Sequence, residues 1–560
     1  MGAEKTEYKI TAVSGITAIE AGYGLLHADT IVATTTDELI ISPNHLEIQL
    51  TVCEKTTNRR IADLGLDLGI YDAILSVREN KTMLAIKNIK LILAPPSNIR
   101  RKFGARYGSL RYDHDVIISK QGSTATWGSL WKTGEVSDIV VDFESGYKFL
   151  FWKGMSYAPS WAADNIMTSL FFAETVEPGV YRDCCEMMSD RECRYSHARI
   201  IQNSDARVIV HWRCALADSA YNICRNQWAD ELFYIYPDGT VCRNVTIYID
   251  PNDERAWKDC EKTGKRMPVS MLDNIPGKRT FNDMEFIAVN PMGSASEDNL
   301  APEALTILDC GNFRQTCEWP EPPDFSKTPA PELSEYIFKI NYKNRPSVFV
   351  ASHAENMKIS LMGNAGMIYE AGAVVEDDCW KTVSDVPSMF GNFIHWPLTR
   401  GYGTSALMNR DYFNDRPTHT FLGHANNAPV EVGDNGAVTW IWLTGIADDD
   451  EHEMREKVKA WLNPVSINDA VYDRKQRAYI VDNAAGKDEV ELEVTQDDEV
   501  AKPSFVICGW ESEQISVYAN NTELNHDIFS AGVERYMDKI YTVVTLKKNL
   551  PGGSQVIIRK

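Results

Sequence analysis

Alternating apolar and polar residues predict β-strands along most of the chain. Short runs rich in branched and aromatic residues are separated by glycine, aspartate, asparagine and proline, as in strands joined by turns. The segments ESG (144–146) and PDG (237–239) are typical hairpin connections. The clearest runs lie at residues 46–52, 82–94, 138–143, 147–152, 206–212, 231–236 and 240–249. The pattern therefore predicts an all-β protein made of antiparallel sheets.

Helical windows are scarce, and no repeat supports a closed ring of sheets. The clearest helix is predicted over residues 448–462, where Asp448 can cap the start and Pro464 ends the helix. The sequence lacks the repeat of roughly 40 to 50 residues that a regular propeller shows. We therefore expect a large antiparallel multi-sheet β-sandwich, with a degenerate β-propeller as the alternative.

Changes in composition predict the domain organisation. Five prolines between Trp319 and Leu333 indicate an extended connection over residues 319–333. This connection would separate an N-terminal β region, 1–318, from a second β region with its helix, 334–465. Residues 466–560 are expected to form a small C-terminal β domain, with PSFVICGW and YTVVTL as its clearest strands.

Charge and hydropathy limit the classes of partner that the protein can be expected to bind. The 560 residues carry a formal net charge of −22, which makes nucleic acid and anionic membranes poor partners. No window approaches the roughly 18 apolar residues of a membrane span. The first residues lack the apolar run of a secretory signal. We therefore expect a cytoplasmic protein, or a secreted or periplasmic one whose leader has been removed.

The cysteines do not indicate a metal site. Twelve cysteines occur without the paired CxxC spacing of zinc sites, and no DxDxDG calcium loop is present. Cys214, Cys224 and Cys242 lie in strand-like runs, so we expect them to act as small apolar core residues. No metal ligand is predicted, although a divalent cation bridging an acidic substrate is left open as a cofactor. The sequence does not indicate an oligomeric state.

The stretch CRYSHARIIQNSDARVIVHWR, residues 193–213, predicts a hairpin with chemically active side chains. Because side chains alternate along a strand, Tyr195, His197 and Arg199 should share one face. On the second strand, His211 and Arg213 should lie opposite the apolar face of residues 208, 210 and 212. If paired residue numbers sum to 408, His197 lies opposite His211 and Tyr195 opposite Arg213. A slip of one residue would separate the two histidines.

The same region is rich in arginine and aromatic residues. Residues 182–225 contain seven arginines, no lysine and six acidic residues. Arginine suits the planar recognition of carboxylate or sulfate, although such a surface can also be a solvated lattice of ion pairs. Aromatic rings beside polar groups are typical of sugar-binding sites. The rings flanking the hairpin are Trp152, Tyr157, Trp161, Trp212, Tyr221, Trp228 and Tyr234.

A second patch lies in the glycine-rich segment GNFIHWPLTRGYGTS. His395 and Arg400 are its candidate site residues, because loops often carry function. His419 and His424, slightly further along, are too loosely spaced to indicate a metal site, so we interpret them as structural.

Four segments resemble a known family. FWKGMSYAPSWAADN, MSDRECRYSHARIIQNSDARVIVHWR, YIYPDGTVCRNVTIYI and FIHWPLTRGYG are similar to segments of β-rich polysaccharide lyases that cleave uronic-acid polysaccharides such as ulvan and glycosaminoglycans. The resemblance covers about residues 100–425. It implies cleavage by β-elimination, with a carbohydrate dehydratase as a related alternative, and an acidic polysaccharide or oligosaccharide as the partner.

The residue types suit that chemistry. Elimination beside a uronate requires a cation or hydrogen-bond donor on the carboxylate, a base for the C5 proton and an acid for the leaving oxygen. We predict His197 or His211 as the base, Tyr195 or Tyr234 as the acid, and Arg213 or Arg199 on the carboxylate. Further substrate contacts are predicted from Asn165, Trp161, Tyr157, His395 and Arg400.

Two other classes of function stay open. A glycoside hydrolase would need two carboxylic acids across a groove. The candidates are Asp164, Glu174, Glu186, Asp190 and Asp230. A non-catalytic carbohydrate-binding protein would need the same rings and arginines but no base.

Overall fold

A computed structural model describes most of the chain, with gaps. The described residues are 8–10, 19–22, 25–26, 30–33, 41–42, 46–66, 69–79, 81–93, 103–108, 115–117, 124–126, 137–163, 166–176, 180, 185–190, 193–218, 220–260, 264–268, 279–290, 296–318, 330–361, 418–447, 451–483, 486–495, 498–536 and 539–560. The predicted connection at 319–333 and the candidate loop around His395 lie wholly or largely outside this set.

Strands dominate the described residues, which confirms the all-β prediction. The sheets are almost entirely antiparallel, and none of the described sheets closes into a barrel or ring, in keeping with a multi-sheet sandwich. The α-helices in this part of the chain are α2 (Ser296–Asn299) and α7 (Glu451–Leu462). The second confirms the predicted helix, whose first residues, 448–450, are not described. No described helix is long and apolar enough to cross a membrane.

The chain divides into two compact units. The first comprises residues 1–111 with 133–142, and the second residues 112–132 with 143–560. This division falls inside the predicted 1–318 region. The first unit contains β1 (Tyr8–Ile10), β2 (Ile19–Gly22), β3 (Leu25–Leu26), β4 (Thr30–Ala33), β5 (Ile41–Ser42), β6 (Leu46–Val52), β7 (Lys55–Thr57), β8 (Gly69–Glu79), β9 (Thr82–Leu93), β10 (Gly104–Gly108) and β13 (Asp138–Asp142). Its main sheet has the order β4-β9-β8-β6-β7.

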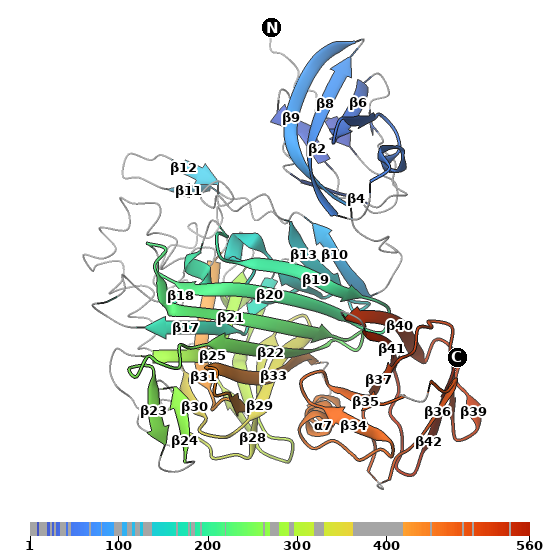
Figure 1. Cartoon of the computed structure of the whole chain (residues 1–560). Coiled ribbons are helices and arrows are strands. Elements are labelled where there is room, and N and C mark those ends of the chain that lie inside the picture. Colours follow the sequence, from blue (N-terminus) through green and yellow to red (C-terminus); the bar gives the residue numbers. More distant parts are fainter. Residues whose placement is uncertain are drawn as a thin grey trace. The chain divides into compact units, whose positions relative to one another are not determined.

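The second unit contains a long antiparallel sheet that carries the candidate hairpin (Figure 1). Its strands, in order across the sheet, are β19 (His197–Asn203), β20 (Val208–Ala217), β21 (Ile223–Ile235), β22 (Thr240–Tyr248), β33 (Ala437–Ala447), β29 (Ser347–His353), β28 (Glu335–Tyr342), β26 (Leu300–Leu308) and β27 (Arg314–Cys317). Shorter strands extend the network: β17 (Phe172–Val176), β18 (Cys185–Glu186) and β32 (Glu431–Val432).

A second layer packs against this sheet through aromatic residues. The layer consists of β14 (Lys148–Phe151), β15 (Pro159–Ala163), β16 (Ile166–Ser169), β25 (Arg279–Asn290), β31 (Thr418–Asn426) and β30 (Lys358–Leu361). Phe151 on β14 meets Phe233 on β21 edge to face, with ring centroids 5.0 Å apart. The indole of Trp161 on β15 donates a 3.0 Å hydrogen bond to Thr444 on β33. The core therefore lies between the two layers.

The candidate hairpin faces this core with its apolar side. Val208, Val210, Trp212 and Cys214 on β20 are fully buried, as the alternation predicted. Cys224 and Cys242 are also fully buried in β21 and β22, which confirms their expected role as apolar residues. The inner face of β21 also carries Glu231, which forms a buried two-pronged ion pair with Arg243 at 2.7 Å. The other face of the hairpin must therefore point away from the core.

Residues 466–560 form two small sheets around their own core. One has the order β34 (Ala470–Asp473), β35 (Ala478–Val481), β37 (Ser504–Cys508), β41 (Lys539–Leu546), β40 (Phe529–Tyr536). The other has the order β36 (Glu489–Glu493), β42 (Gln555–Arg559), β38 (Ser516–Ala519), β39 (Thr522–Glu523). Phe505, Trp510, Val517 and Ile558 are among the buried residues that the two sheets share.

The C-terminal domain is fastened to the turn of the candidate hairpin. Arg207 in this turn forms a two-pronged ion pair with Glu534 on β40 at 2.7 and 2.6 Å, and both side chains are at most 5% exposed. Thr545 donates a hydrogen bond to the carbonyl of Ala206 at 2.9 Å. Gly532 approaches Ser204 so closely that a Cβ at position 532 would lie 2.3 Å from that side chain. The turn is therefore held by a domain more than 300 residues away in sequence.

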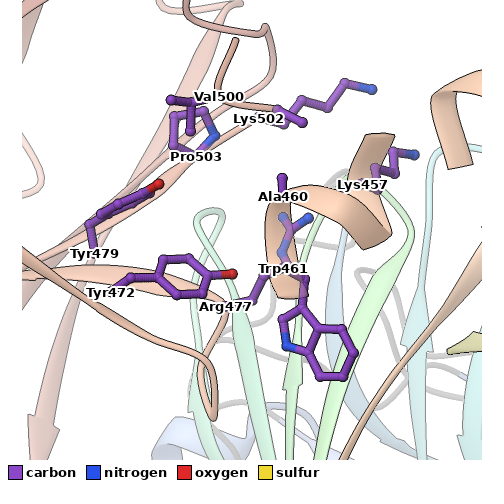
Figure 2. A pocket seen from close by; sticks show the side chains of 10 residues that line it. Lys457, Ala460, Trp461, Tyr472, Arg477, Tyr479, Val500, Lys502 and Pro503 are labelled. Carbon is purple, nitrogen blue, oxygen red and sulfur yellow. The ribbon is translucent and has the colours of Figure 1, made fainter. Parts of the chain in front are cut away.

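A second contact joins this domain to the β21–β22 turn. Arg477 donates two 3.0 Å hydrogen bonds to Asp238, and both side chains are nearly buried. A small cavity of about 10 Å³ beside Arg477, room for roughly one water, lies between α7 and the C-terminal strands. Figure 2 shows that Lys457 and Lys502 line this cavity with their alkyl chains while their ammonium groups point away from Arg477.

Neutralising Glu534 should lower the free energy of unfolding much more than neutralising its exposed neighbour Arg535. Removing one charge of a buried pair leaves the other unpaired, which costs about 3–5 kcal/mol. We expect Glu534→Gln to lower the free energy of unfolding by that amount in urea titrations. Arg535→Gln breaks an exposed pair with Glu511 and should cost less than about 1 kcal/mol. Equal losses of stability in the two variants would contradict the conclusion that the buried Arg207–Glu534 ion pair holds the turn.

Acid should weaken the Asp238 contact in a defined window. Burial alone would raise the pKa of Asp238, but the charges of Arg477 and Lys457 hold it at about 2, below its ordinary 3.8. A lowered pKa stabilises the fold above the unfolded value, so this stability, about 2 kcal/mol, is lost as the pH falls from about 4 towards 2. Urea titrations across this range should show a shallower pH dependence for Asp238→Asn than for the native chain. The exposed Asp434→Asn should keep the native dependence, and a native dependence in Asp238→Asn would refute the assignment.

Candidate active site on the outer face of the hairpin

The pairing of β19 with β20 places His197 and His211 on one face but not directly opposite each other. His197 pairs with Arg213, and Arg199 pairs with His211. The predicted pairing of His197 with His211 is therefore wrong by two residues. The turn spans residues 204–207 and a bulge lies between Ile200 and Gln202, and both change the register. Because side chains alternate between the two faces of a strand, a shift of two residues keeps His197 and His211 on the same face, so the predicted shared face is confirmed.

Asp230 links the histidine and arginine of β20. His211 Nε2 lies 2.9 Å from Asp230 Oδ1, and Arg213 donates a hydrogen bond to the other carboxylate oxygen. Asp230 reaches both because it pairs directly with Arg213 across β20 and β21. His211 is 18% exposed and Arg213 is 44% exposed, so both can meet a ligand from solvent.

His197 and Arg199 on β19 are exposed, as Arg213 is. Neither makes a hydrogen bond or an ion pair with any residue that the structure describes. Arg199 faces His211 across the strand pair, and His197 is a diagonal neighbour of His211. Diagonal side chains on one sheet face are about 7–8 Å apart at their backbones, within reach of long side chains. One carboxylate, two imidazoles and two guanidiniums thus share this surface.

Aromatic rings border these polar groups. The ring centroid of Tyr195 lies 6.2 Å from that of Tyr221 and 6.1 Å from that of Trp228. The guanidinium of Arg213 lies 4.9 Å from the centre of the Trp228 ring, and Arg194 lies 4.1 Å from that of Tyr221. Such cation–π contacts present charge and ring surface side by side.

Asp190 fixes the segment that leads into β19. Its buried carboxylate accepts backbone N–H hydrogen bonds from Arg194, Tyr195 and Ser196 at 2.8, 2.7 and 2.8 Å. Burial raises the pKa of Asp190, against the effect of these three donors. From the sequence alone, Asp190 is a candidate only for the acid of a hydrolase. The sequence offers no clear signal for this role, because the donors lie four to six residues after Asp190, beyond the usual two-residue span of a local Asx turn.

Several predicted site residues do not reach this surface. Trp161 and Tyr157 are fully buried, so the prediction that they contact substrate is wrong. Tyr234 shares the outer face but packs against the apolar cluster between the long sheet and α7, and burial raises its pKa above the ordinary value of 10. This does not suit the predicted role of an acid. Asn165, His395 and Arg400 lie outside the described residues, so their roles stay predictions.

The remaining candidate carboxylates and the possible metal ligands do not indicate another site in the described part of the chain. Glu186 and Asp190 are buried, Glu174 on β17 is half-buried, and Asp164 is not described. No group of three or more histidine, cysteine, aspartate or glutamate side chains is placed to hold a metal ion among the residues that could be searched.

Comparison with known proteins leaves the family open. No family model matches the chain, and no curated protein matches it. The resemblance to uronate-cleaving lyases therefore rests on the sequence segments alone.

Replacing Asp190 should loosen the start of β19 without disturbing a similar loop nearby. Asp218 accepts backbone hydrogen bonds from Ala220 and Asn222 in the same manner. We expect Asp190→Ala to speed hydrogen exchange at residues 194–196 by about tenfold, the effect of losing one net hydrogen bond per amide. Asp218→Ala should instead affect residues 220–222. Unchanged exchange at 194–196 in Asp190→Ala would show that other contacts hold the segment.

Proposed function

We propose that the protein is a polysaccharide lyase that cleaves a uronic-acid-containing glycan by β-elimination, leaving an unsaturated uronate end. The observation that carries this proposal is the shared outer face of β19, β20 and β21, where His197, Arg199, His211 and Arg213 surround Asp230. This set contains every group that elimination beside a carboxylate requires.

Arg199 is the best placed group to neutralise the substrate carboxylate. The C5 proton of a uronate is weakly acidic until its carboxylate is neutralised, so a cation must bind there before a side-chain base suffices. Arg213 already shares Asp230 with His211, whereas Arg199 has no ion pair among the described residues. A planar guanidinium can bind both carboxylate oxygens.

His211 is the best placed base. An ionised carboxylate only accepts hydrogen bonds, so the hydrogen between His211 and Asp230 belongs to Nε2. In the neutral ring, Nδ1 then carries the lone pair that can take the C5 proton. Asp230 would hold the ring in this tautomer and stabilise the imidazolium that forms, as carboxylates do beside other catalytic histidines.

His197 is better placed than Tyr195 to protonate the leaving oxygen. His197 is a diagonal neighbour of His211, whereas Tyr195 lies two residues further along, roughly 7 Å in a strand. The base must reach the proton on C5, and the acid must reach the leaving oxygen on the adjacent carbon of the same sugar. Tyr195, in contact with Trp228, is better suited to contact the flanking sugar.

A carbohydrate-binding protein without catalysis is the second candidate. The bordering rings and arginines favour glycan binding whether or not a reaction follows. A hydrolase is less favoured, because Asp230 is already paired with two basic side chains and Glu186 and Asp190 are buried.

Incubation with acidic polysaccharides separates these functions. Ulvan and glycosaminoglycans would be supplied, and both ultraviolet absorbance of an unsaturated uronate and new reducing ends would be followed. We expect absorbance to grow with the native protein. His211→Gln should slow it by about a hundredfold or more, the usual loss of a general base. His526→Gln, an exposed histidine in the C-terminal domain, is the matched control and should keep the native rate.

The other outcomes are equally distinct. Reducing ends without absorbance would mean hydrolysis, and binding without either product would mean a non-catalytic protein. Equal rates for His211→Gln and the native chain would remove His211 from the mechanism.

A further inference from the structure

One cross-strand row next to the charged groups is lined by aromatic rings. Trp228 on β21 pairs directly with Tyr248 on β22, and Trp228 pairs on its other side with Ala215 on β20. Tyr195 meets Trp228 across the small Ala215 side chain. Tyr248 in turn pairs with Ala437 on β33. The rings therefore stand in a row that crosses the strands, flanked by small residues.

The rings of this row are accessible. Tyr248 is 41% exposed, which is unusual for a large side chain in the middle of a sheet. Tyr195, Tyr221 and Trp228 are partly exposed. Within the described residues, the indole N–H of Trp228 and the hydroxyl of Tyr248 have no hydrogen-bond partner, so each can bind a polar group of a ligand.

The neighbouring cross-strand row runs parallel to the aromatic row and carries charged and polar side chains. It runs from His197 through Arg213 and Asp230 to Thr246 and Thr439, whose hydroxyls are 2.9 Å apart. With Arg199 and Arg194 close by, three arginines accompany one aspartate on a protein whose net charge is −22. Two of these arginines contact rings at the β19–β20 end of the aromatic row, Arg194 at Tyr221 and Arg213 at Trp228.

We propose that this row, Tyr221–Tyr195–Trp228–Tyr248, is a binding platform for an acidic glycan that crosses the strands and is longer than a disaccharide. Three strand spacings cover roughly 15 Å, which exceeds the length of two linked sugars. The rings contact the apolar faces of successive sugars, while the adjacent arginines bind their acidic groups. The platform therefore favours oligosaccharides longer than two sugars over disaccharides.

The identity of the glycan rests on the proposed function, but the platform itself can be tested without turnover. Tyr248 lies at the end of the row, furthest from His197, so its loss should matter only for ligands long enough to reach it. Calorimetric titrations would use di-, tetra- and hexasaccharides of a uronic-acid polysaccharide with the His211→Gln protein, which prevents consumption of the ligand.

We expect the hexasaccharide to bind more tightly than the disaccharide. Tyr248→Ala should weaken hexasaccharide binding by about three- to tenfold, the effect of one aromatic contact, and leave disaccharide binding unchanged. Tyr536→Ala removes a still more exposed ring from β40, 60% exposed against 41% for Tyr248, and is the control that should change neither.

Other outcomes overturn the inference in recognisable ways. The platform is refuted if Tyr248→Ala affects both lengths equally or neither, or if only uncharged oligosaccharides bind. Length-dependent binding that Tyr248→Ala weakens, in a protein that gives no unsaturated product from any polysaccharide, would leave the platform standing and refute the lyase proposal alone.

Discussion

The burial of one face of β20 is the constraint on which the candidate site depends. Val208, Val210 and Trp212 are fully buried against the second layer, so the alternation of the strand forces His211 and Arg213 outwards. Pairing with β19 and β21 then brings His197, Arg199 and Asp230 to the same side. The chemistry of the surface is thus a consequence of how the core packs.

Two distant parts of the chain stabilise this arrangement from opposite ends of the hairpin. At the turn, the ion pair of Arg207 with Glu534 ties the hairpin to the C-terminal domain. At the other end, Asp190 binds three consecutive backbone amides that lead into β19. Neither contact touches the proposed reacting groups, yet both determine where His197 and Tyr195 lie. They are the kind of supporting contacts that hold a site in one geometry.

The sequence predicted the parts of this structure that follow from local alternation. The all-β class, α7 and the shared face of His197 and His211 depend on apolar periodicity, which is visible in the chain itself. The register of β19 depends on a bulge and on a turn held by Glu534, which no local pattern reveals. Trp161 lies in a strand with two buried faces, whose pattern does not show which side a ring occupies, and Tyr157 lies in the turn before that strand, where no periodicity indicates burial.

We propose that the outer face of this hairpin binds a uronate with its carboxylate on Arg199 and its C5 proton towards His211. A crystal structure of the native protein with a non-cleavable acidic oligosaccharide tests this most directly. We expect a sugar carboxylate within hydrogen-bond distance of the Arg199 guanidinium, with His211 Nδ1 facing C5 of that sugar. An oligosaccharide bound to another surface, or one whose carboxylate points away from Arg199, would contradict it.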